Sequence, residues 1–161
     1  MDLERFKKNS VLLKKENSFF LKSLKKKNER KLDNSFHQLH TDVFENINCL
    51  QCANCCKTTS PMVRETDISK IAHHLKKKPS EIITKYFLKE TDGTYIVNSA
   101  PCPFLDAENY CSIYAVRPGA CRDFPHTNRK KMSQILDITL ENTLVCPAVL
   151  EIVEQLKKIQ L

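Results

Sequence analysis

The sequence predicts an α+β fold that is mainly helical: a small cysteine-rich domain containing a β-hairpin, preceded by a helical N-terminal extension. Three observations support this class. Apolar residues recur at helical spacing in long stretches near both ends of the chain. An Asp92-Gly93 pair lies between two segments of extended character, which is a hairpin signal. Eight cysteines accompany a modest apolar fraction of 41% and no tryptophan, so cross-links are expected to supplement the hydrophobic core.

Two helices are predicted in the N-terminal extension. Residues 2–27 have helix-forming composition without proline or glycine. From Leu32 the spacing becomes regular, and a single helix face is expected to pack on the core. It carries Leu32, Phe36, Leu39, Val43 and Ile47. We therefore divide the sequence into a basic helical extension, residues 1–47, and a cysteine-rich domain with a C-terminal helix, residues 48–161.

The elements of the second part follow from local signals. Thr66 and Ser80 are preferred N-cap residues and predict that a short helix follows each of them. Residues 101–125 are interrupted by prolines and cysteines and are expected to be irregular. Pro147 is well placed in the first turn of a final helix, whose apolar residues recur at helical spacing.

Positive charge is concentrated at the N-terminus. The formal net charge is +7, and residues 1–31 hold eleven basic side chains against four acidic ones. Such asymmetry is typical either of a solvated helix face or of a segment that contacts an anionic partner. The basic residues are Arg5, Lys7, Lys8, Lys14, Lys15, Lys22, Lys25, Lys26, Lys27, Arg30 and Lys31.

The beginning of the sequence bears on its compartment. Acidic residues stand beside the start, and no apolar stretch of signal-peptide length follows. No run approaches the ~20 apolar residues that a membrane span needs. We therefore expect a cytoplasmic protein without a membrane span. Thiols stay reduced there, so dense cysteine indicates metal binding or catalysis rather than disulfides.

The first cysteine group is compact. Cys49, Cys52, Cys55 and Cys56 fall within eight residues, in the pattern Cys-x2-Cys-x2-Cys-Cys. Such spacing places sulfurs around a metal from tight turns and occurs in both zinc sites and iron–sulfur loops. Side chains of neighbouring residues usually point apart. We therefore expect Cys55 and Cys56 to serve different metals, or only one of them to be a ligand.

The other four cysteines, Cys102, Cys111, Cys121 and Cys146, are too widely spaced to come from one turn. The fold must gather them, either into two tetrahedral sites or into one centre with spare thiols. Thiolate ligands carry negative charge that nearby donors or cations must offset. The sequence offers Arg117 and Arg122 for this purpose, and His126 as the histidine best placed to join a metal shell.

These motifs resemble the CxxCxxCC family of zinc- or iron-chelating proteins, often called YkgJ-like. The resemblance rests on the cysteine group at 49–56, on Cys102-Pro103-Phe104-Leu105, and on the segment 111–124, which matches C-x-I-Y-x-x-R-P-x-x-C-R-x-F. It covers about Cys49 to Cys146. One departure is Ala53-Asn54, where many members carry glycine; a left-handed turn there is expected to fall on Asn54.

The resemblance implies metal binding without fixing a reaction, and three functions are considered. The first is a metal-chelating protein that holds zinc or iron through its eight cysteines. The second is an iron–sulfur or iron-dependent enzyme with a redox or methyl-transfer role, because a larger relative, flagellin lysine N-methylase, has a similar cysteine region. The third is a zinc-stabilised adaptor that binds nucleic acid through its N-terminal lysines. Scarce glycine argues against a Gly-rich nucleotide loop.

Overall fold

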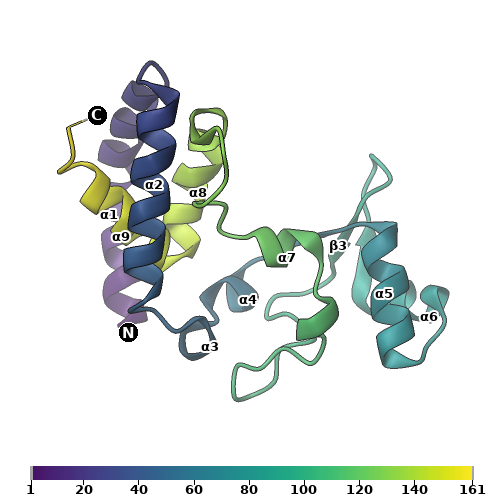
Figure 1. Ribbon diagram of the computed structural model, residues 1–161. Helices are drawn as coiled ribbons and strands as arrows, with labels where there is room; N and C mark the ends of the chain where they lie inside the picture. The colour runs from purple at the N-terminus through teal and green to yellow at the C-terminus, as the bar shows by residue number, and fades with distance from the viewer. Residues whose placement is uncertain (1, 161) are drawn as a thin grey trace. The chain divides into compact units, whose positions relative to one another are not determined.

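The computed structural model describes residues 2–160, which form two compact units (Figure 1). Unit 1 contains the chain up to Cys52 together with the segment from Pro125 onward, and unit 2 is Ala53–Phe124. This division differs from the boundary at residue 47 expected from the sequence. The reason is that the C-terminal helices pack against the N-terminal ones, so the ends of the chain share one core.

Unit 1 is helical within the described residues. Helix α1 packs against α8, α2 packs against α9, and α8 and α9 pack against each other. Figure 1 shows these four helices together. The elements are α1 (Leu3–Leu24), α2 (Glu29–Phe44), α3 (Cys49–Cys52), the 3-10 helix η2 (Met132–Ile135), α8 (Leu136–Val145) and α9 (Pro147–Leu156).

The predicted helix face of α2 forms part of the unit 1 core. Its four apolar residues from Leu32 to Val43 are buried and share one cluster with α9 residues such as Ile152 and Leu156, while Ile47 packs against that cluster. Both N-terminal helices begin at capping side chains. Asp2 accepts the N–H of Arg5, and Asn28 accepts the N–H of Lys31, which satisfies donors that a helix start leaves unpaired.

Side chains of α2 hold the segment that leads into η2. The Asp33 carboxylate accepts the backbone N–H groups of Lys131 and Met132 at 2.7 and 2.8 Å. His37 Nε2 lies 2.8 Å from the carbonyl oxygen of Arg129. These contacts hold the loop before η2 against α2, although the bonded residues are roughly one hundred positions apart in the sequence.

Unit 2 contains a three-stranded antiparallel sheet in the order β1-β3-β2. Strands β2 and β3 form the hairpin predicted around Asp92-Gly93, and Gly93 adopts φ 86, which a glycine tolerates without strain. The elements are α4 (Asn54–Thr58), β1 (Met62–Val63), α5 (Glu65–Leu75), α6 (Pro79–Tyr86), β2 (Phe87–Lys89), β3 (Tyr95–Val97), the 3-10 helix η1 (Tyr114–Val116) and α7 (Gly119–Asp123).

The core of unit 2 joins the regular elements to the irregular segment that follows them. Ile68 and Ile71 of α5 share one apolar cluster with Phe104 and Ile113, and the rings of Tyr86 and Phe104 lie 4.6 Å apart. Cys102 and Cys111 pack against this cluster. The core therefore holds the cysteine-bearing loops in place.

The observed secondary structure confirms the predicted class, mainly helical α+β with a small antiparallel sheet. Helix α5 begins two residues earlier than the Thr66 cap implies, because Arg64 is the N-cap and its backbone N–H bonds to Asp67. None of the helices within residues 2–160 combines the length and apolar character that crossing a membrane requires.

Candidate metal centre

The compact units divide the eight predicted ligands into two groups. Unit 1 contains Cys49, Cys52 and Cys146, and unit 2 contains Cys55, Cys56, Cys102, Cys111 and Cys121. The motif that is continuous in the sequence is thus split between Cys52 and Ala53. None of the eight cysteines, all of which lie in the described part of the chain, forms a disulfide.

The residue at the split has a left-handed backbone conformation. Ala53, with φ 45 and ψ 19, precedes the first residue of α4, Asn54. The expectation that Asn54 makes this turn is wrong. Asn54 is buried and helical, so the turn occurs one residue earlier, at a small side chain that is itself buried. The conformation costs an L-residue about 1 kcal/mol or more.

The neighbouring thiols of Cys55 and Cys56 do not point apart, contrary to our expectation. Their sulfurs lie 4.0 Å apart on α4. This is close to the ~3.8 Å between two sulfurs that share a tetrahedral zinc with bonds of about 2.3 Å. The Cys56 carbonyl also accepts the backbone N–H of Cys102 at 2.8 Å, which fastens α4 to the next cysteine loop.

Cys102 and Cys111 occupy similar turns. The backbone N–H groups of Phe104 and Leu105 bond to the Cys102 thiol, and that of Ile113 bonds to the Cys111 thiol. An antiparallel bridge between Leu105 and Cys111 joins the two loops. Burial raises the pKa of both thiols, and the N–H donors act in the opposite direction. Such donors stabilise a thiolate once it is bound to a metal.

Cys121 on α7 completes a group of four. Burial, followed by repulsion from Cys56, Cys102 and Cys111, raises the pKa of Cys121 to about 12. The pKa of Cys56 is also raised, first by its hydrogen bond with Cys55 and then by burial. The four thiols of Cys56, Cys102, Cys111 and Cys121 therefore lie within electrostatic range of one another. We call them the unit 2 quartet.

The two predicted arginines differ in their surroundings. Arg117 stacks on the Tyr114 ring, with its guanidinium carbon 4.0 Å from the ring centroid, and donates to the Tyr114 carbonyl at 2.9 Å. Its positive charge opposes the rise in the pKa values of Cys111 and Cys121, so it partly offsets thiolate charge. Arg122 is exposed and lies 3.9 Å from the Asp123 carboxylate, a surface ion pair of little energy.

Unit 1 gathers a second set of thiols. Cys49 and Cys52 lie one turn apart on α3, and Cys146 is the N-cap of α9. Burial, and then repulsion from Cys49 and Cys52, raises the pKa of Cys146 to about 11, while the N–H groups of Ala148 and Val149 bond to its thiol. We call Cys49, Cys52 and Cys146 the unit 1 trio.

His126 belongs to unit 1 and has a left-handed backbone with φ 69. Its carbonyl oxygen accepts the N–H of Arg129 at 3.4 Å, and the residue is half-buried. The role of His126 as a ligand stays a prediction.

The structure also shows two residues whose role the sequence did not indicate. Phe104 and Ile113, each two residues after a cysteine, are buried in the unit 2 core and anchor the loops that carry the candidate ligands.

The thiols have the chemistry of metal ligands. Within residues 2–160, no three His, Cys, Asp or Glu side chains are arranged to hold a metal ion as they stand. Thiolates are the preferred ligands of zinc and of iron–sulfur centres. The unit 2 quartet supplies four of them, backbone donors to two sulfurs, and a guanidinium.

The fold and these thiols define a small, mainly helical, cysteine-rich protein of the metal-chelating class. The sequence profile of the CxxCxxCC family, described as "Putative zinc- or iron-chelating domain", matches residues 48–144. The chain belongs to this family. An uncharacterized protein of Methanocaldococcus jannaschii, MJ0661, is 35% identical over 92 residues, which are 53% of this chain and 50% of that relative. The match thus spans half the length of the relative. No solved structure matches the chain.

Proposed function

We propose that the protein chelates zinc or iron through the unit 2 quartet, Cys56, Cys102, Cys111 and Cys121. The observation that carries this proposal is the mutual repulsion of these thiols around Cys121, because four half-buried thiols within electrostatic range form a set that a cation stabilises. Cys55, whose sulfur lies 4.0 Å from that of Cys56, is the alternative ligand from α4.

A metal bound here would have a structural effect. The quartet comes from α4, two loops and α7, elements that are short in this unit. A shared ion would link all of them, and the free energy of binding would add to the free energy of folding. Arg117 would reduce the cost of holding a tetrathiolate centre, whose formal charge with zinc is 2−.

The unit 1 trio is proposed as a separate thiol set, in which the N–H groups at the start of α9 would bond to the Cys146 sulfur once a metal had displaced its proton. A cytoplasmic location is part of this proposal, because thiol ligands stay reduced in that compartment. An iron–sulfur centre with a redox or methyl-transfer role is the alternative, and it is distinguished by colour, since Zn²⁺ has a filled d shell and contributes no visible absorption.

Anaerobic purification followed by elemental analysis and an absorption spectrum tests the proposal. Stoichiometric zinc in a colourless protein, or iron in a coloured one, is expected. A preparation that neither carries nor takes up either metal under these conditions contradicts the proposed function.

Two cysteine variants test the assignment to the units. Cys121→Ser should abolish the metal held by unit 2, whereas Cys146→Ser should leave that metal in place. Each variant serves as the control for the other, because both replace one half-buried thiol. If Cys146→Ser lowers the metal content of the protein as much as Cys121→Ser does, the assignment of the metal to the unit 2 quartet is wrong.

A further inference from the structure

Helix α1 has two faces of unusual character. One is buried in unit 1 and carries Phe6, Leu21 and Leu24. The opposite face follows a spacing of three and four residues, so its side chains form one line along a helix about 33 Å long. It carries Arg5, Lys8, Leu12, Lys15, Phe19 and Lys22, and we call it the outer stripe.

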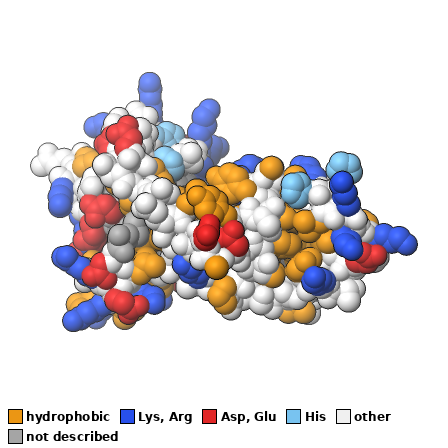
Figure 2. Space-filling model, turned by 90° about the horizontal axis from the view of Figure 1, so that it is seen from below, with side chains coloured by type: hydrophobic (Ala, Val, Ile, Leu, Met, Phe, Trp, Pro, Cys, Tyr) orange, Lys and Arg blue, Asp and Glu red, His pale blue; other side chains and the backbone are white. Residues whose placement is uncertain are grey.

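Large apolar side chains on this stripe are exposed to solvent. Leu12 is 69% and Phe19 68% exposed, and the adjoining Val11 is 73% exposed. Single exposed apolar residues need no explanation, but these three lie within nine residues of one helix. Lysines alternate with them along the helix. On the face drawn in Figure 2, Lys and Arg side chains lie beside both hydrophobic and acidic ones.

The positive charge of the stripe is not cancelled locally. The two acids of α1 are both engaged: Glu4 pairs with Lys7, and Glu16 pairs with Lys157. No described acidic side chain forms an ion pair with Lys8, Lys15 or Lys22, which all belong to the outer stripe.

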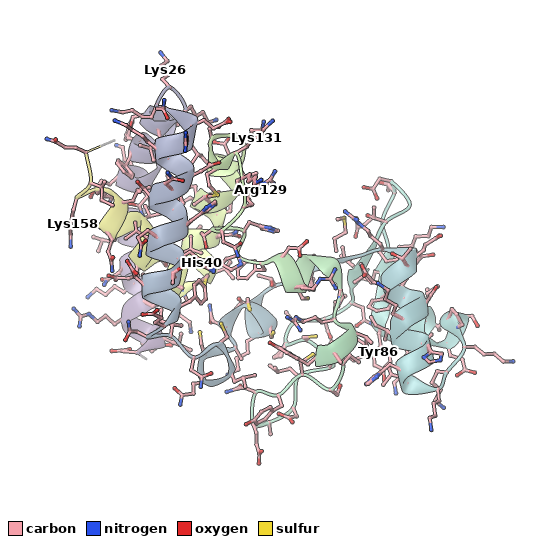
Figure 3. All side chains as sticks on the ribbon, in the orientation of Figure 1. Lys26, His40, Tyr86, Arg129, Lys131 and Lys158 are labelled. Atoms are coloured by element: carbon pink, nitrogen blue, oxygen red, sulfur yellow. The ribbon has the colours of Figure 1, made fainter. Side chains whose placement is uncertain are left out.

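More positive charge lies at the end of unit 1 where α1 turns into α2. Figure 3 shows Lys26 at this end and Arg129 and Lys131 on the loop before η2. Asp33, an acid of that region, uses both carboxylate oxygens on backbone N–H groups of the loop. This end of unit 1 therefore adds further positive charge to that of the outer stripe.

We propose that the outer stripe of α1 binds the surface of an anionic lipid bilayer. Lysine ammonium groups reach lipid phosphates while their stems lie along the acyl boundary, and Leu12 and Phe19 gain burial among the lipids. Phosphates of a nucleic acid would use the same lysines but leave both apolar side chains in water. A protein partner would find only three apolar residues on a convex helix, less than a stable interface needs.

This mode of binding agrees with the absence of a spanning helix among residues 2–160, because α1 would lie on the membrane and not cross it. It does not depend on metal, so its failure would leave the proposed function untouched.

A tryptophan reporter tests the proposal directly, since the chain contains no tryptophan. The Phe19→Trp protein is mixed with vesicles of phosphatidylcholine alone or with about 30% phosphatidylglycerol. A blue shift of emission is expected with the anionic vesicles only. Leu88→Trp, at a residue 54% exposed on β2, is the matched control and should not shift. No shift for Phe19→Trp, or an equal shift for both variants, overturns the proposal.

Charge and apolar contributions are separated by co-sedimentation with the same vesicles. Replacing Lys8, Lys15 and Lys22 by glutamine should weaken binding about 100-fold, given about 1 kcal/mol for each lysine at an anionic surface. The same change at the exposed Lys70, Lys77 and Lys78 removes equal charge from unit 2 and should have a much smaller effect. Equal weakening by both triple variants contradicts a specific stripe.

The double variant Leu12→Ser, Phe19→Ser should also weaken vesicle binding, by about tenfold or more. Its folding is checked by circular dichroism, and no loss is expected because both side chains are exposed. Tight binding of duplex RNA or DNA that depends on the three lysines, with vesicle binding unaffected by the double variant, would identify nucleic acid as the partner and overturn the proposal.

Discussion

Raising the pH should destabilise the metal-free protein through Cys121, and this change can be calculated from the structure. Burial and three neighbouring thiols raise the pKa of Cys121 from an ordinary value of 9.0 to about 12 in the folded chain. An unfolded chain loses this proton first. The stabilising contribution is therefore fully present below pH 9 and is lost progressively as the pH rises toward 12.

The magnitude follows from the linkage of proton binding to folding. Between pH 8 and pH 10 the unfolded state gains about 1.4 kcal/mol from ionising this thiol, while the folded state gains almost nothing. Urea unfolding of the metal-free, reduced protein at several pH values measures the loss. Cys121→Ser has no thiol to ionise at this position, so its stability should fall by about 1.4 kcal/mol less over the same interval.

The comparison depends on the pH slope rather than on the absolute stability of the variant. A serine in place of Cys121 can change the free energy of unfolding at every pH without affecting this difference. Equal slopes for the two proteins would refute the reasoning, because they would mean that Cys121 ionises as readily in the folded chain as in the unfolded one. Metal-loaded protein should lose the effect, since its thiols are already deprotonated.

Three further substitutions test separate features. Asn17 is fully buried on α1 with neither amide atom hydrogen-bonded, so Asn17→Ala should raise stability by about 1 kcal/mol in thermal unfolding, and a decrease would reveal a partner for the amide. Ala53→Gly should stabilise by up to about 1 kcal/mol by relieving the left-handed backbone, whereas no gain would argue against strain there. Asp33→Ala should lower the free energy of unfolding by about 2 kcal/mol, because it removes the acceptor of two N–H groups. The control is Asn34→Ala at the neighbouring exposed position, and an equal loss of stability in both variants would contradict this role of Asp33.

Local signals were enough to predict much of the secondary structure. The face of α2 was predicted from its spacing alone, because a buried helix side must repeat with the helical period. The hairpin was predicted from Asp92-Gly93, since the turn needs a residue that accepts positive φ. Helix α8 was not predicted. It packs against both α1 and α9 and buries the polar Thr139 and Thr143, so its sequence shows no clear apolar period.

The cysteine pattern identified a metal-chelating family from the sequence, because closely spaced thiols in ordered submotifs are rarely assembled for another purpose. Sequence spacing could not say which thiols work together. The compact units separate Cys52 from Cys55, three residues away, and place Cys56 in the same unit as Cys121, sixty-five residues away.

What the sequence determined by itself was therefore the donor chemistry and the local elements, both of which depend on neighbours along the chain. The tertiary structure decided the grouping of the ligands and the composition of the units. These depend on which distant apolar surfaces bury one another: α2 against α9 in unit 1, and Phe104 and Ile113 against the α5 face in unit 2. Burial of that kind brings thiols together without leaving a spacing that the sequence could reveal.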